Sequence, residues 1–205
     1  MKKLTENVKV RFVLFVVFAM ATLAAPLSII WKYENTLRHG TLFKFRTQPV
    51  DPYDAFRGRY VTLSFADNWM EGTDTDSEKG SGILYVRLKR DAEGFAVPAE
   101  VSRKRLSRDD VVTVDAFGWG GHPWQFNYPF DRYYLPEDIA PMAEQLYREA
   151  NMRGGANSRG ESRAKADTYV TVRVRNGVGV IEELWLNGVP VREAVRAQMQ
   201  KQKTR

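Results

Sequence analysis

The longest apolar stretch of the chain lies near its start, where residues 12–30 read FVLFVVFAMATLAAPLSII without a charge. A helix of this length covers about 28 Å at about 1.5 Å per residue, which matches the hydrocarbon thickness of a bilayer. The pattern therefore predicts a transmembrane anchor over residues 12–31.

A cleaved signal peptide is the alternative for this segment. The tripeptide Ala-Met-Ala at 19–21 has the small-x-small form of a cleavage site, which would leave a mature chain that begins at Thr22. However, the apolar stretch exceeds the usual signal-peptide core of about 7–15 residues and continues through Trp31. We therefore expect the anchor to be retained.

The charges before the span set its expected orientation. Lys2, Lys3, Lys9 and Arg11 precede it, and Lys and Arg stay on the cytoplasmic side of a membrane. Residues 1–11 are thus predicted to be a cytoplasmic leader of a single-pass membrane protein. The remainder is predicted to be extracytoplasmic, as a domain over 32–190 and a basic tail over 191–205.

Beyond residue 31, apolar and polar residues alternate with period two, which is typical of half-buried β-strands. Such runs predict strands at 41–47 (TLFKFRT), 60–65 (YVTLSF), 83–90 (ILYVRLKR), 95–101 (FAVPAEV), 111–119 (VVTVDAFGW), 167–175 (DTYVTVRVR) and 178–186 (VGVIEELWL). Their apolar members are expected to share the core-facing side of each strand.

Turn residues separate these runs. Residues 91–94 (Asp-Ala-Glu-Gly) predict a hairpin loop, and Pro98 predicts that the following strand lies at a sheet edge. Asn176-Gly177 predicts a type I′ hairpin, because both residues accept a positive φ. Asn187-Gly188 predicts a further reversal.

One segment has helical periodicity instead. After Pro136, residues 137–153 place Ile139, Met142 and Leu146 at helical spacing. We therefore expect a mainly β fold, an antiparallel β-sandwich or barrel-like domain of about eight strands with one amphipathic helix.

Composition narrows the functional classes. The 205-residue chain has a net charge of +6, but residues 32–190 contain 22 Lys/Arg against 23 Asp/Glu, so no nucleic-acid partner is expected. The absence of cysteine excludes disulfides and thiolate chemistry. His39 and His122 are too far apart in sequence to indicate a zinc site, and no glycine-rich phosphate loop indicates a cofactor.

In the stretch VDPYDAFRGRYVTLSF (50–65), a segment rich in Pro, Asp, Arg and Gly leads into a strand. Pro52 keeps Asp51 extended, Asp54 can bond backbone amides, and Gly58 is expected to have a positive φ before the strand begins at Tyr60. Each distinctive residue of the stretch therefore has a structural explanation.

GRYVTLSF (58–65) resembles the signature of the bacterial family named for its motif Gly-Asp-Tyr-x-x-Leu-x-Tyr. DRYYLPE (131–137) and the closing run 169–188 extend the resemblance, while Arg59 and Phe65 depart from the motif Asp and Tyr. The resemblance implies anchoring in the bacterial inner membrane with a periplasmic domain, but no biochemical activity. The positions that it marks as structural or binding residues are Pro49, Asp51, Pro52, Gly58, Tyr60, Leu63, Arg132, Tyr133, Pro136 and Glu137.

Candidate chemistry is sparse, and we predict no catalytic residue, cofactor or metal ligand. Asp51, Asp54 and Glu137 can cap turns or pair with arginines such as Arg132, although a facing pair would suit acid/base work. The aromatic residues of 117–134 can fill the core or stack a sugar ring. Ser64 has no lysine at a spacing that indicates a Ser/Lys peptidase.

Two functional classes remain open at this point. The first, which we expect, is a noncatalytic extracytoplasmic module that contacts another membrane protein, such as a multi-pass one. The second is an exported hydrolase or a small-ligand or carbohydrate-binding protein that uses Asp51, Glu137 and the 117–134 aromatic region. An exposed contact surface favours the first class, and a pocket with converging carboxylates favours the second.

Overall fold

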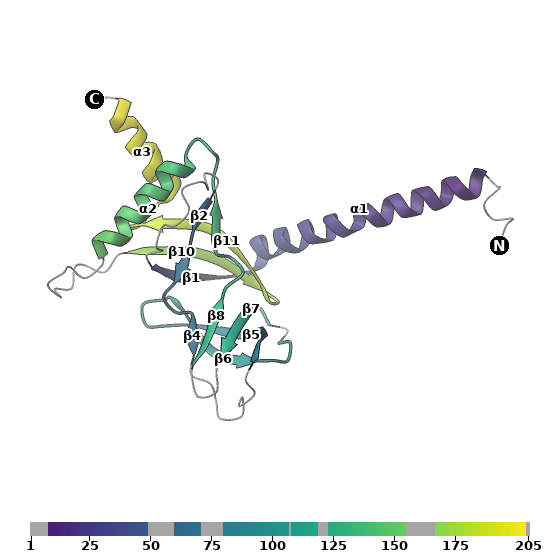
Figure 1. Ribbon diagram of the computed structural model, residues 1–205, viewed down its shortest axis with the longest axis horizontal. Helices are drawn as coiled ribbons and strands as arrows, with labels where there is room; N and C mark the ends of the chain where they lie inside the picture. The colour runs from purple at the N-terminus through teal and green to yellow at the C-terminus, as the bar shows by residue number, and fades with distance from the viewer. Residues whose placement is uncertain are drawn as a thin grey trace.

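The computed structural model describes residues 8–48, 60–70, 80–106, 108–118, 123–154 and 167–203. It begins with one long helix that projects from a strand-rich domain, and two further helices lie at the other side of that domain (Figure 1). The fold is mainly antiparallel β, as the sequence predicts.

The projecting helix, α1 (Val8–His39), contains the predicted span and continues eight residues beyond it. It is the one helix in the described part of the chain that is long and apolar enough to cross a membrane, and the domain covers none of its apolar stretch. These properties are consistent with a signal anchor or a signal sequence. Its last turns pack on the domain, where Thr36 is only 2% exposed.

Twelve strands form two five-stranded antiparallel sheets and one two-stranded ribbon in the described residues. The first sheet has the order β12 (Val189–Pro190), β11 (Val178–Leu186), β10 (Thr168–Arg175), β1 (Thr41–Gln48), β3 (Ser64–Phe65). The second has the order β4 (Trp69–Met70), β8 (Trp124–Asn127), β7 (Val111–Gly118), β5 (Gly80–Arg90), β6 (Ala96–Ser102). The ribbon pairs β2 (Tyr60–Thr62) with β9 (Arg132–Tyr134).

The two shorter helices, α2 (Ala140–Gly154) and α3 (Val191–Lys203), lie together against the first sheet (Figure 1). The helix predicted after Pro136 is confirmed, with a turn in which Ile139 and Ala140 N–H donate to the Pro136 carbonyl before the helix begins. The sequence did not predict α3, which falls in the stretch expected to be a basic tail. Its Val191 and Val195 are fully buried.

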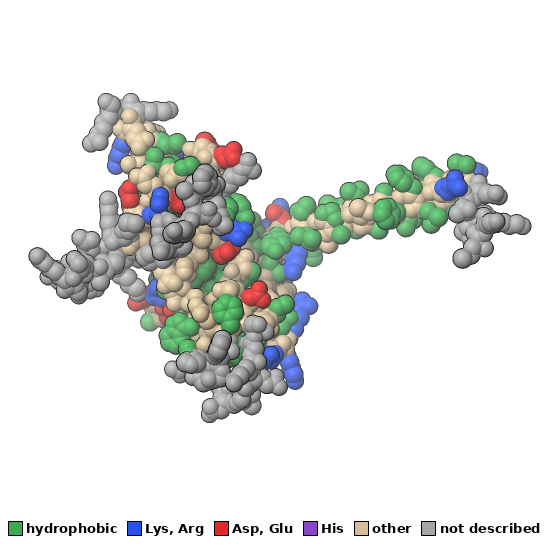
Figure 2. Space-filling view, in the orientation of Figure 1, with side chains coloured by type: hydrophobic (Ala, Val, Ile, Leu, Met, Phe, Trp, Pro, Cys, Tyr) green, Lys and Arg blue, Asp and Glu red, His purple; other side chains and the backbone are tan. Residues whose placement is uncertain are grey.

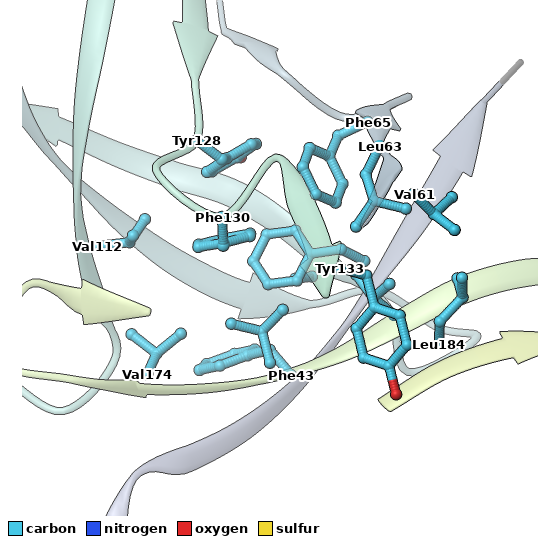
Figure 3. Close-up of a cluster of buried hydrophobic side chains, with 14 of the residues drawn as sticks. Phe43, Val61, Leu63, Phe65, Val112, Tyr128, Phe130, Tyr133, Val174 and Leu184 are labelled. Carbon is cyan, nitrogen blue, oxygen red and sulfur yellow. The ribbon is translucent and has the colours of Figure 1, made fainter. Parts of the chain in front are cut away.

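The core contains the apolar faces that the alternation predicts. Phe45 lies at its centre, with ring centroids 5.1–5.7 Å from those of Phe65, Tyr128 and Phe130. Figure 3 shows Phe65, Tyr128 and Phe130 gathered with residues of the first sheet and the ribbon. The buried residues that confirm the predicted faces are Phe43, Phe45, Val61, Leu63, Phe65, Leu84, Val86, Leu88, Val170, Val172 and Val174.

The predicted turns are also confirmed. Asn176 and Gly177 have φ values of 48° and 89°, and Asn187 and Gly188 have 51° and 79°, as type I′ reversals require. The hairpin at 91–94 joins β5 to β6, and Pro98 lies in β6 at the edge of its sheet. Strand β6 also contains a bulge beside Pro98, since Arg87 pairs with Glu100 and Leu88 with Pro98.

Candidate functional site

The two stretches that carry the sequence signature pair with each other. In the β2–β9 ribbon, Tyr60 lies opposite Tyr134, Val61 opposite Tyr133, and Thr62 opposite Arg132. Because successive side chains of a strand point to opposite faces, the ribbon has an inner and an outer face.

The inner face belongs to the core. Val61, Leu63 and Tyr133 are all buried, and Figure 3 shows the three side chains in one cluster. The Leu63 N–H donates to the Asp131 carbonyl over 2.8 Å, which continues the pairing of the two stretches beyond β2. Leu63 and Tyr133 are therefore structural residues that hold the ribbon against the domain.

The outer face presents Tyr60, Arg132 and Tyr134 to the surface. The Tyr60 and Tyr134 rings lie 5.5 Å apart between centroids, and the Arg132 guanidinium lies 5.2 Å from the Tyr60 ring. Tyr134 is 62% exposed. Arg132 is also exposed, whereas Tyr60 is half-buried. This ordered surface group of two aromatic rings and a guanidinium is the candidate site of the chain.

The Tyr133 hydroxyl connects the ribbon to the first sheet and to α3. It donates a 2.5 Å hydrogen bond to Glu183 Oε1, which also accepts from the Leu184 N–H over 3.0 Å. Arg192 of α3 acts electrostatically on the same hydroxyl. The pKa of Tyr133 is raised to about 12, first by burial and then by the Glu183 carboxylate, while Arg192 lowers it.

Sequence reasoning missed Glu183, because its position depends on a β-bulge. Thr171 pairs with Glu183 and Val172 with Ile181, so Glu182 is the extra residue of β11. The insertion changes which side chains face the core after Ile181. The sequence does contain a signal, since the inward-facing Ile181 and Leu184 are three positions apart, whereas regular alternation would place them two apart.

With Tyr133→Phe, the free energy of unfolding is expected to fall less at alkaline pH than it does in the wild type. The pKa of Tyr133 rises from 10.0 to about 12, so the fold keeps a proton that the unfolded chain loses between these values. The free energy of unfolding therefore falls as pH rises through that window. Burial also raises the pKa of Tyr147, so the free energy of unfolding of the variant still falls with pH, but less steeply.

The measurement is urea unfolding of the full chain in detergent at about pH 8 and about pH 11, for wild type and Tyr133→Phe. At the lower pH the variant is expected to lose about 1 kcal/mol, the value of one hydrogen bond. A variant that loses as much stability as wild type between the two pH values would contradict the role of this hydroxyl.

The remaining predicted site residues fall partly outside the described part of the chain. Pro49, Asp51, Pro52 and Gly58 lie outside the described residues, whereas Pro136 and Glu137 are exposed. Among the described residues, no three His, Asp or Glu side chains are grouped as a metal site requires. The acid/base pair considered for Asp51 and Glu137 therefore gains no support from the described structure.

The aromatic region mostly fills the core. Trp124, Phe126, Tyr128 and Phe130 are buried, while Trp119 lies outside the described residues. A hollow of about 340 Å³ lies beside β3 and β8, and its lining contains one carboxylate, that of Asp131. The described lining of the hollow thus lacks the pair of carboxylates that a glycoside hydrolase uses.

A second group of charged side chains, around Arg46, is paired within the domain. Arg46 of β1 lies 3.4 Å from Asp67, 2.7 Å from Asp91 and 2.7 Å from Glu93 between charged atoms, and its guanidinium stacks 4.0 Å from the Phe95 ring. These contacts join the first sheet to the β5–β6 hairpin. The cluster is therefore a link between the sheets rather than a reactive site.

Comparison with known proteins supports the interpretation of the signature. A family profile described as GDYXXLXY protein matches residues 22–184, which include the ribbon and most of the strands. No curated protein and no solved structure matches the chain.

Proposed function

We propose that this chain, which belongs to the GDYXXLXY protein family, is a membrane-anchored extracytoplasmic accessory module that binds another membrane protein. The contact surface in this proposal is the outer face of the β2–β9 ribbon. The observation that carries the proposal is the surface group of Tyr60, Arg132 and Tyr134 on the two strands of the signature.

The chemistry of this face suits protein recognition. Tyr and Arg are enriched among residues that dominate binding energy, because they combine a large contact area with directed polar groups. The neighbouring rings and guanidinium hold one another in place before binding, which lowers the entropy lost on association. The buried inner face fixes the ribbon, so the outer group is presented on a rigid element.

The proposed membrane anchor determines the location of the module in the cell. An uncharged span of about 28 Å preceded by four cationic residues supports a cytoplasmic N-terminus and an exported domain at the inner membrane. A reporter fused at Arg205 is expected to be active only outside the cytoplasm. Cytoplasmic activity would contradict this topology, and a mature N-terminus at Thr22 would contradict the retained anchor.

The proposed contact is tested by copurification from detergent. Replacing Arg132 and Tyr134 by Ala is expected to weaken partner binding by about 2 kcal/mol or more, which is about 30-fold, because both side chains would lie at the centre of the contact. Ile83→Ala is the matched control, since Ile83 is also 62% exposed but lies on β5 in the other sheet.

The two variants separate the possible outcomes. Retention of the partner by Ile83→Ala and its loss from the double variant supports the proposal. Full retention of the partner by the double variant, at an unchanged melting temperature, contradicts it.

A further inference from the structure

The connection between β6 and β7 carries a dense group of positive charge. Arg103, Lys104, Arg105 and Arg108 lie within six positions, and all four side chains are exposed. We refer to these four residues as the basic loop. The function proposed above does not use them.

The basic loop is ordered by its neighbours. The Ser102 hydroxyl accepts a hydrogen bond from the Lys104 N–H over 3.1 Å and donates to the Lys104 carbonyl over 3.0 Å. The Arg103 guanidinium lies 5.7 Å from the ring of buried Trp124. These contacts place Arg103 and Lys104 at the surface of the second sheet.

Nearby carboxylates are already engaged by other cations or by one member of the loop. Asp109 lies 3.8 Å from Arg175, and Asp110 lies 3.2 Å from Arg108. Glu100 forms a 2.9 Å pair with Arg87. Within the described part of the chain, Lys104 and Arg105 therefore form no ion pair with these acids.

The loop leads into the end of the domain from which α1 leaves. Gly177, at the tip of the β10–β11 hairpin, exchanges backbone hydrogen bonds of 2.9 and 3.0 Å with Thr113 and Val111 at the start of β7. The same hairpin lies beside the start of β1, because Thr41 pairs with Val174. Figure 2 shows Lys and Arg side chains on the flank of the domain that faces the side of α1.

The orientation of α1 relative to this flank is fixed by packing. Only Gly40 separates α1 from β1, and its N–H donates to the Thr36 carbonyl over 2.8 Å. The Gly40 carbonyl accepts from the Arg173 side chain over 3.3 Å. Because no linker separates the helix from the domain, the flank cannot swing away from the surface that α1 crosses.

We propose that the basic loop lies against the outer surface of the membrane beside α1 and binds anionic lipid headgroups. The cations project from an open loop rather than line a pocket, which suits a planar anionic surface better than a single soluble anion. Attraction to such a surface acts within about 8 Å at physiological ionic strength. The proposal rests on the membrane anchoring proposed above.

The test uses the full chain reconstituted in vesicles. Because the chain contains no cysteine, Leu106→Cys provides a single labelling site inside the loop for a fluorophore. A quencher attached to lipid headgroups then reports contact with the surface. We expect quenching in phosphatidylcholine vesicles that contain phosphatidylglycerol, and its loss in pure phosphatidylcholine or at high salt.

Two charge variants in the labelled background make the test specific. Arg103→Gln/Lys104→Gln/Arg105→Gln is expected to lower the quenching in anionic vesicles to the level in neutral ones. The control, Arg148→Gln/Arg196→Gln/Lys201→Gln, makes the same change in net charge on α2 and α3, which lie away from α1 (Figure 1). It is expected to leave the quenching unchanged.

Alkaline extraction of the same vesicles tests the membrane anchoring separately from the lipid contact of the loop. A chain that stays in the bilayer but shows equal quenching in neutral and anionic lipid contradicts the lipid contact alone. A chain that is extracted contradicts the anchor and, with it, the lipid contact. Equal loss of quenching in both charge variants would also overturn the proposal, since it would indicate a nonspecific effect of net charge.

Discussion

Phe45→Ala is expected to lower the free energy of unfolding by about 3–5 kcal/mol, the usual cost of replacing a buried Phe by Ala. The Phe45 ring is 2% exposed and meets three other aromatic rings edge-on, so its removal leaves a cavity that rigid neighbours cannot fill. The ring also joins β1 of the first sheet to the segment after β8. Urea unfolding of the full chain in detergent, followed by tryptophan fluorescence, measures the loss.

Phe117→Ala is the control for this prediction. Phe117 is 42% exposed at the end of β7, so the same chemical change there removes much less buried surface. We expect it to cost about 1 kcal/mol or less. Equal losses from the two substitutions would contradict the placement of Phe45 at the centre of the core.

Gly177→Ala is expected to destabilise the domain by about 2–4 kcal/mol through two separate effects. Gly177 has a φ of 89°, where a side chain costs about 1–3 kcal/mol. In addition, a Cβ at this position would lie 2.5 Å from the Thr113 hydroxyl oxygen, closer than a nonbonded contact allows. The clash falls where the β10–β11 hairpin tip docks on β7.

Two comparisons separate these effects. Gly188 has a φ of 79° with open space around its Cβ position, so Gly188→Ala is expected to show the backbone cost alone. Adding Thr113→Ala to Gly177→Ala removes the clashing oxygen and is expected to recover the difference between the two glycine variants. Equal unfolding midpoints for Gly177→Ala and Gly188→Ala would contradict the close docking of the hairpin on β7.

The parts of the fold that the sequence predicts are those set by local chemistry. Alternation identifies the inward faces of β1, β5 and β10, because one side of each strand is buried at several successive alternate positions. The Asn-Gly pairs identify their turns because few other residues adopt a positive φ. Helix α2 follows from its periodicity, although it begins at Ala140 after a turn.

The parts that the sequence does not predict depend on tertiary contacts. The strands of two or three residues, such as β3 and β12, are too short to show a period. Helix α3 has a narrow apolar stripe at Val191, Val195 and Met199, which its many cations obscure. The bulge in β11 breaks the alternation, so the partner of Tyr133 could not be identified.

The candidate site was predictable only in part. The resemblance marks Tyr60, Arg132 and Tyr133, but it does not show that the two stretches pair. That pairing places Tyr133 inside and Arg132 outside, and it adds Tyr134, which sequence reasoning did not single out. Long-range strand pairing of this kind leaves no trace in the local pattern of either segment.

The central claim is that the outer face of the ribbon contacts another membrane protein, and photo-crosslinking in intact cells tests it most directly. A photoreactive amino acid replaces Tyr134 in one variant and Ile83 in the other, two positions that are each 62% exposed. The account predicts a discrete crosslinked membrane protein from position 134 and none from position 83. No adduct at position 134, or the same adducts from both positions, would contradict it.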